Sequence, residues 1–182
     1  MDRLVPRPHR LILVMGVASV GKTTIAKLIL RRIWCTYLDN NYFADPFSCV
    51  SRTDAGYLAV RSKLYEAIYR VALENLSVKN SVLLDIPHVK ESRDKSWKNT
   101  IQRMSRQTRA RLRVIRCVCS EQTLKDRMLK RGEPRDKWKT NNWRQFLKQE
   151  PIVFEVPFPF LEIDTECSMT ANSDKAIEYI MS

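Results

Sequence analysis

Residues 16–23 read GVASVGKT, which is a complete phosphate-binding loop of the form G-x-x-x-x-G-K-T. The loop follows the apolar run 11–15 and precedes a helical pattern, so the chain must form a strand, the loop and a helix in succession. Two glycines let the backbone curl until successive N–H groups point inward, toward phosphate oxygens. This order of elements favours an α/β fold and predicts a nucleotide-binding site.

Each side chain of the loop has an expected task. Lys22 is placed to reach the β- and γ-phosphates of a nucleotide, and the Thr23 hydroxyl is placed to ligate Mg²⁺. The N-terminus of the following helix adds partial positive charge. We expect the nucleotide to contact Gly16, Ala18, Ser19, Val20, Gly21, Lys22, Thr23 and Thr24.

Short apolar segments alternate with helical patterns along the rest of the chain. The expected strands are residues 11–16, 36–38, 81–85, 112–119 and 160–163. The expected helices cover 22–33, 54–76 and 96–109, and two more begin near residues 120 and 172. Such alternation indicates a doubly wound parallel sheet with helices on both faces, in one domain spanning 1–182.

Charge and cysteine content indicate which partners and which cell compartment to expect. The formal charge of +12 suggests an anionic partner, such as nucleic acid or a phosphate-rich small molecule, although a solvated basic surface would give the same charge. The five cysteines lack metal-ligand spacing, so we expect reduced thiols and a cytoplasmic protein. No apolar run is long enough to span a bilayer, and the basic start followed by residues 11–18 is not a secretory signal because the phosphate loop begins inside that stretch.

Two aspartates stand at the ends of expected strands. Asp85 follows an apolar strand, and ligands gather beyond the carboxyl ends of strands in doubly wound sheets, so Asp85 is a candidate Mg²⁺ ligand beside Thr23. Asp39 ends another strand and could accept a proton from a substrate hydroxyl, or orient it. Either aspartate could instead initiate a turn for local reasons.

Basic residues gather in two blocks. The second block consists of Arg127, Lys130, Arg131, Arg135, Lys137 and Lys139. In it, Arg127 and Arg131 lie one helical turn apart, and Arg135 follows a break at Gly132. We expect residues 127–143 to form a lid that closes over a nucleotide and neutralises charge on a transferring phosphoryl group. Trp138 and Trp143 could stack on a base or pack against the lid. The first block contains Arg103, Arg106, Arg109, Arg111, Arg113 and Arg116.

The phosphate loop, the acids after the second and third strands, the long helix and the Arg-x-x-x-Arg pattern together resemble the small P-loop kinases. This group includes nucleoside monophosphate, shikimate, gluconate and chloramphenicol kinases and the zeta-toxin group. The resemblance implies a three-layer fold with a five-stranded parallel sheet of order 2-3-1-4-5, a short lid, and Mg-ATP as phosphoryl donor. It also implies catalytic roles for Lys22, Asp39, Arg127 and Arg131.

The acceptor is left open by the sequence. Such kinases bind their second substrate near the start of the long helix, which makes Arg52, Tyr57 and Arg61 candidates together with His88, beyond the third strand. The expected activity is transfer of the γ-phosphoryl of ATP to a hydroxyl or phosphate of a small molecule. Two alternatives stay open: a polynucleotide-end kinase that uses the first basic block, and a non-catalytic ATP-binding module. The Asn-Lys-x-Asp pattern of guanine recognition is absent, which disfavours a GTPase.

Overall fold

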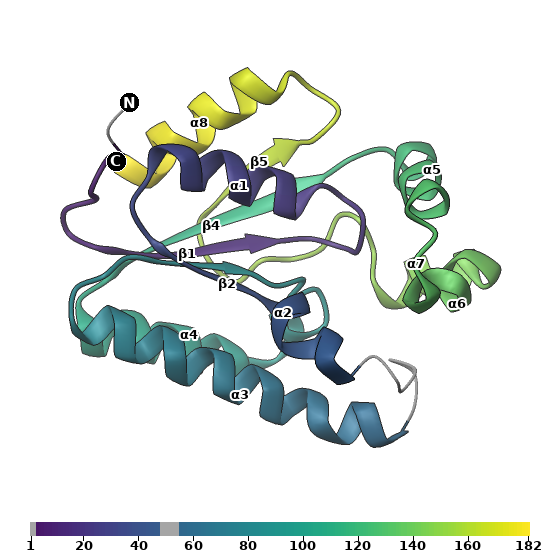
Figure 1. The fold of residues 1–182 in the computed structure, drawn as a ribbon, viewed down its shortest axis with the longest axis horizontal. Coiled ribbons are helices and arrows are strands. Elements are labelled where there is room, and N and C mark those ends of the chain that lie inside the picture. Colours follow the sequence, from purple (N-terminus) through teal and green to yellow (C-terminus); the bar gives the residue numbers. More distant parts are fainter. Residues whose placement is uncertain (1–2, 48–54) are drawn as a thin grey trace.

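The computed structural model describes residues 3–47 and 55–182, and its centre is a five-stranded sheet (Figure 1). All strand pairs are parallel, and the strand order is β2-β3-β1-β4-β5. This confirms the order implied by the resemblance. The strands are β1 (Arg10–Met15), β2 (Thr36–Asp39), β3 (Val82–Asp85), β4 (Arg111–Val118) and β5 (Phe160–Asp164).

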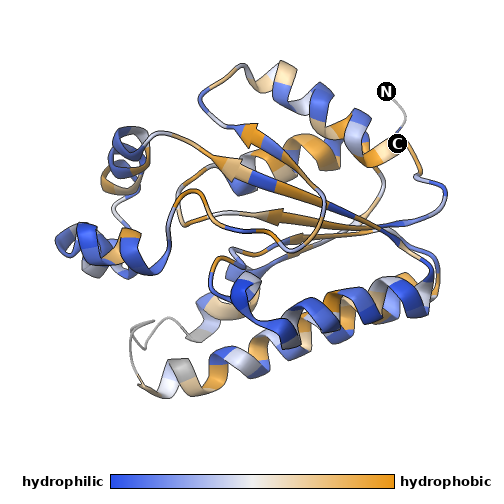
Figure 2. Cartoon of the chain, turned by 180° about the vertical axis from the view of Figure 1, so that it is seen from behind, coloured by the Kyte–Doolittle hydropathy of each residue, from blue (hydrophilic) through white to orange (hydrophobic). Residues whose placement is uncertain are grey.

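Helices cover both faces of the sheet and form the outer layers. The first group, α1 (Lys22–Arg32) and α8 (Met169–Met181), packs together on one face. On the opposite face lie α3 (Ala55–Ser77) and α4 (Lys95–Thr108), which also contact each other. Because helices shield both faces, the central strands β1 and β3 are almost entirely apolar, whereas β4 carries three arginines, and Figure 2 shows both orange and blue on the strands.

The core is built around the central strand β1. Leu11, Ile12, Leu13, Val14 and Met15 are all fully buried. The helices contribute apolar stripes at helical spacing, for example Ile25 and Ile29 from α1 and Ile68 from α3. Among the described residues, no helix combines the length and the apolar character that crossing a membrane requires.

Short helices gather beyond the carboxyl ends of the strands (Figure 1). They are α2 (Asn40–Ala44), a 3-10 turn (Asp45–Phe47), a second turn (Glu91–Arg93), α5 (Glu121–Arg131), a third turn (Pro134–Asp136), α6 (Lys137–Asn141) and α7 (Trp143–Gln149). The sequence patterns predict α5 but miss α2, α6 and α7, because helices of five to seven residues are too short to show periodicity. Helix α8 begins at Met169, earlier than residue 172, because the Ser168 side chain caps it by accepting from the Ala171 N–H.

Candidate active site

The phosphate loop connects β1 to α1 in a conformation that depends on its two glycines. Gly16 has φ 142°, and a Cβ built on it would lie 2.8 Å from the backbone oxygen of Cys117. Gly21 has φ 110° and forms the N-cap of α1. Any other residue at Gly16 would combine a strained backbone with a steric clash. The sequence GVASVGKT therefore determines a tight loop with α1 starting at Lys22.

Lys22 and Thr23 point into the site from the first turn of α1. The Lys22 Nζ donates to the backbone oxygen of Val17 at 2.9 Å, and burial lowers the pKa of this amine although Asp85 opposes the shift. The Thr23 hydroxyl donates to Asp85 Oδ2 at 2.6 Å. A hydroxyl and a carboxylate in contact at the phosphate loop are oxygen ligands of the kind that Mg²⁺ prefers. The two side chains therefore fit a magnesium ion.

Asp85 and Asp39 lie side by side because β2 and β3 pair them in register. The Tyr37 hydroxyl lies 3.0 Å from Oδ2 of Asp39 and 3.0 Å from Oδ2 of Asp85, and so bridges the two carboxylates. Burial raises the pKa of Asp85. The other oxygen of Asp39 accepts from the Asn41 N–H at 2.7 Å and caps α2. The sequence analysis missed Tyr37, although its place two residues before Asp39 puts both on one face of the strand.

A cavity of about 610 Å³ extends from the phosphate loop to α3 and the short helices. From the loop and the expected metal site, Ala18, Ser19, Gly21, Lys22, Thr23, Thr24 and Asp85 line it. From the expected acceptor side and the lid, Tyr57, Arg61, Arg127, Arg131 and Arg135 line it. The structure thus brings most of the predicted site residues to one cavity.

Four predicted residues lie elsewhere, and one cannot be placed. Gly16, Val20, Asp39 and His88 do not line the cavity. Asp39 is only 4% exposed because its oxygens are bonded to α2 and Tyr37. Arg52 lies outside the described residues.

His88 is packed behind the cavity wall. Its ring is fully buried, its Nε2 lies 2.8 Å from the Tyr69 hydroxyl, and its centroid lies 5.0 Å from the Trp97 ring. Burial, together with Arg61 and Lys22, lowers the pKa of His88 to about 3. The imidazole is therefore a neutral core group rather than a contact for a substrate in the cavity.

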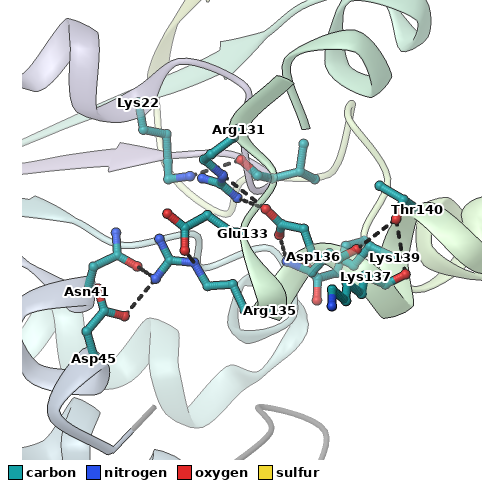
Figure 3. A network of polar contacts seen from close by, with 12 residues as sticks. Lys22, Asn41, Asp45, Arg131, Glu133, Arg135, Asp136, Lys137, Lys139 and Thr140 are labelled. Carbon is teal, nitrogen blue, oxygen red and sulfur yellow. Dashed lines mark hydrogen bonds and ion pairs between the residues drawn. The ribbon is translucent and has the colours of Figure 1, made fainter. Parts of the chain in front are cut away.

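The three arginines of the segment predicted as a lid have different partners. Arg127 donates to the backbone oxygen of Val20 at 3.1 Å and to the Thr165 hydroxyl at 2.8 Å, which ties the phosphate loop to the end of β5. Arg131 binds the buried Asp136 through Nε at 3.0 Å and through Nη2. Arg135 reaches across to α2 and donates to Asn41 at 3.1 Å and to Asp45 at 2.6 Å (Figure 3).

Asp136 anchors this network. Its carboxylate is 2% exposed and also pairs with Lys139 at 3.4 Å, and Figure 3 shows it between Arg131 and Lys139. Neither Asp136 nor Thr165 was predicted, because a single Asp or Thr in a polar segment carries no distinguishing pattern. Of the two tryptophans, Trp138 lines the cavity, whereas Trp143 packs on Phe146 and donates to Glu121.

The first basic block is divided by the fold. Arg103, Arg106 and Arg109 are exposed on α4 or at its end. On β4, Arg111 and Arg113 donate to the C-terminal turn of α8, and Arg116 pairs with Glu162. The six arginines therefore do not form one continuous track for a polynucleotide backbone.

Known proteins show the same architecture. A family model described as an AAA domain matches residues 11–151. The solved structure of the Mycobacterium tuberculosis APS kinase CysC with AMPPNP and APS superposes with a TM-score of 0.68 at 14% identity, covering 97% of this chain and 99% of that chain. A gluconokinase from Sinorhizobium meliloti 1021 gives 0.60 at 15% identity, covering 96% and 93%. Kti12 from Chaetomium thermophilum, in complex with ADP-AlF3, gives 0.60 at 18%, covering 93% and 96%. No curated protein sequence matches the chain.

Proposed function

The chain belongs to the AAA domain family and has the fold of the small P-loop kinases, and we propose that it is an ATP-dependent phosphotransferase. It would move the γ-phosphoryl group of Mg-ATP to a hydroxyl or phosphate of a small molecule. One observation carries the proposal: a single cavity joins Lys22 and Thr23 of the phosphate loop to Tyr57 and Arg61 of α3. A bound phosphoryl donor and a bound acceptor could therefore meet inside this one cavity.

The donor half rests on the phosphate loop. Amides of the loop and the N-terminus of α1 would hold the phosphates, and Lys22 would leave the Val17 oxygen to contact the β- and γ-phosphates. Arg131 and Lys139 share the single carboxylate of Asp136, so these three residues keep a net positive charge. Arg131, which lines the same cavity, would therefore stabilise charge on the transferring group. Arg127 would act by fixing the loop through Val20. Solved structures of the same fold that hold AMPPNP or ADP-AlF3 support nucleotide binding by this chain.

The metal site would be formed by Thr23 and Asp85. A bound Mg²⁺ would neutralise negative charge that develops on the phosphates during transfer. The Thr23 hydroxyl, which now donates to Asp85, would turn its oxygen toward the ion, and Asp85 would hold it directly or through water. Binding of the ion would also keep the buried Asp85 ionised, because a cation favours the charged carboxylate.

The transfer step can be written for an acceptor hydroxyl. Its oxygen forms a bond to the γ-phosphorus, and the bond from the γ-phosphorus to the bridging oxygen breaks. ADP leaves with the electrons of that bond. The hydroxyl proton would pass to Asp39, which lies beside Asp85 behind the Tyr37 hydroxyl and would have to turn toward the cavity, while Asp85 holds the ion.

The test measures ADP release with Mg-ATP over the hydrolysis background, across nucleosides, nucleotides, sugars and antibiotics. We expect at least one acceptor to raise the rate, and Lys22→Ala to lower that rate roughly 10²-fold or more. Lys27→Ala, on the exposed side of the same helix, is the matched control and should retain activity. ATP binding without stimulation by any acceptor, or near-normal activity of Lys22→Ala, would support a non-catalytic module instead.

A further inference from the structure

The part of the cavity beside Tyr57, Arg61 and Glu91 is called the acceptor end here. Its cationic side chains are paired with carboxylates. Arg61 donates to Glu91 Oε1 at 2.5 Å and to the Tyr65 hydroxyl at 3.1 Å. Lys90 pairs with Glu150 at 3.3 Å. These four charged residues all line the cavity, and their formal charges cancel.

The donor end is different. Lys22 and Arg127 also line the cavity, but their hydrogen bonds go to the uncharged oxygens of Val17, Val20 and Thr165. Positive charge available for phosphates is thus concentrated where ATP would bind. A second anion at the other end would have to draw Arg61 or Lys90 away from its carboxylate, which would then repel the anion.

Two residues of the acceptor end also hold buried oxygen atoms, just behind the cavity surface, that lack hydrogen-bond donors. Within the described residues, Oε2 of Glu91 and Oδ1 of Asn40 are buried without a partner. Asn40 is only 7% exposed, and both residues line the cavity. Buried oxygens of this kind require a donor, and hydroxyl groups supply one. A phosphate or carboxylate group supplies none.

Apolar surface completes the acceptor end. Tyr57 and Tyr65 from α3, Val89 and Phe146 line the same cavity. Faces of this type pack against the carbon framework of a ring compound, while the polar groups orient its substituents. The wall therefore combines apolar faces, unsatisfied oxygen acceptors and cancelled charge.

We propose that the phosphoryl acceptor is an uncharged, hydroxyl-bearing ring compound, of the sugar or nucleoside kind, and not a compound that carries phosphate or carboxylate. This inference rests on the proposed phosphotransferase function and narrows its acceptor. Glu91 selects for neutral acceptors because it cancels the charge of Arg61 through Oε1, and its buried Oε2 would accept from a substrate hydroxyl once the side chain turned toward the cavity.

The first experiment compares neutral ring compounds with anionic counterparts that keep the ring. ADP release is measured with Mg-ATP and glucose or glucuronate, and with cytidine or cytidine 5′-monophosphate. We expect the neutral member of a pair to give a kcat/KM at least roughly tenfold higher, because the anionic member leaves a buried charge unpaired. Higher kcat/KM for the anionic members would overturn the inference while leaving the phosphotransferase function intact. Loss of ATP binding would instead contradict the function itself.

The second experiment uses inorganic phosphate as an anion probe with Mg-AMPPNP present in excess. Thermal unfolding of the wild type should not respond to phosphate, whereas Glu91→Gln should gain stabilisation because Arg61 loses its carboxylate partner. Glu66→Gln removes an exposed partner of Lys63 on the same helix as Arg61, and serves as the matched control without a response. Equal stabilisation of the wild type and Glu91→Gln by phosphate would overturn the inference.

Discussion

The Thr23 hydroxyl donates a 2.6 Å hydrogen bond to the carboxylate of Asp85, and this contact joins the first turn of α1 to the end of β3. The same carboxylate oxygen lies 3.0 Å from the Tyr37 hydroxyl. Asp85 is 2% exposed, so the protein holds an acid in its interior in contact with two hydroxyl groups. Such a site costs stability and is retained where it serves chemistry.

Asp85→Asn is expected to stabilise the fold and abolish phosphoryl transfer. Burial raises the pKa of Asp85 above its ordinary value of 3.8, so the wild type loses stability as the pH rises through the pKa of the folded state. The variant should therefore unfold at higher denaturant concentration than the wild type at pH 7, and the difference should disappear below pH 3.8. Asp174→Asn, at an exposed ion pair, is the control. A less stable Asp85→Asn at pH 7 would contradict this account.

Substitutions of Asp39 separate its two roles. Asparagine caps helices about as well as aspartate, so Asp39→Asn should keep α2 in place and lower kcat by removing the charge. Asp39→Ala should lower kcat and also reduce the free energy of unfolding by about 1 kcal/mol, the typical effect of a lost cap. Chemical denaturation and steady-state kinetics measure both. If Asp39→Asn has wild-type kcat, Asp39 serves only as a cap.

Asp136→Asn should loosen the segment predicted as a lid. It leaves the cations of Arg131 and Lys139 without a carboxylate partner, and both side chains are partly solvated. The expected loss is about 1–3 kcal/mol of unfolding free energy, with a higher KM for ATP because Arg131 is no longer held. Asp126→Asn, which leaves the Arg131 pair intact, is the comparison. Unchanged stability in Asp136→Asn would show that the network contributes little to the fold.

Because His88 is buried, we expect the free energy of unfolding to fall in acid in a specific way. Its pKa is about 3 in the fold against 6.5 as the ordinary value, so the wild type should lose stability as the pH falls from 6.5 toward 3. The slope from this one group is about 1.4 kcal/mol per pH unit. His88→Asn should be less stable at pH 7 but flatter with pH; asparagine tolerates the positive φ of 51° found here. Tyr69→Phe keeps the imidazole and should retain the wild-type slope, whereas equal slopes for wild type and His88→Asn would refute this assignment.

The parts of the fold that repeat a strong pattern could be predicted from the sequence. The GVASVGKT motif predicts the phosphate loop and the strand before it. The apolar segment that ends at Asp85 predicts a second central strand, and the two strands pair with each other. Contacts between distant segments could not be predicted. The Arg61–Glu91 pair spans thirty positions and carries no motif, and Asp136 is recognisable as an anchor only once Arg131 is folded beside it.

His88 illustrates the other limit. A histidine just beyond a strand end is compatible with a substrate contact, but side-chain direction depends on the local backbone, which here has φ 51°. That conformation directs the ring toward Tyr69 and Trp97 instead of the cavity. The position of His88 in the sequence places it near the cavity, whereas its backbone angle determines whether the side chain points into the cavity or into the core.

The register that sets Asp39 opposite Asp85 would also make the proposed catalysis a reporter of correct folding. A slip of β2 by one residue would turn Tyr37 and Asp39 to the other face of the sheet, since side chains alternate along a strand. Such a misfolded form could keep its helices and compactness while its carboxylate pair was gone. Recovery of phosphotransferase activity during refolding would then count molecules with native strand alignment, a quantity that circular dichroism does not measure.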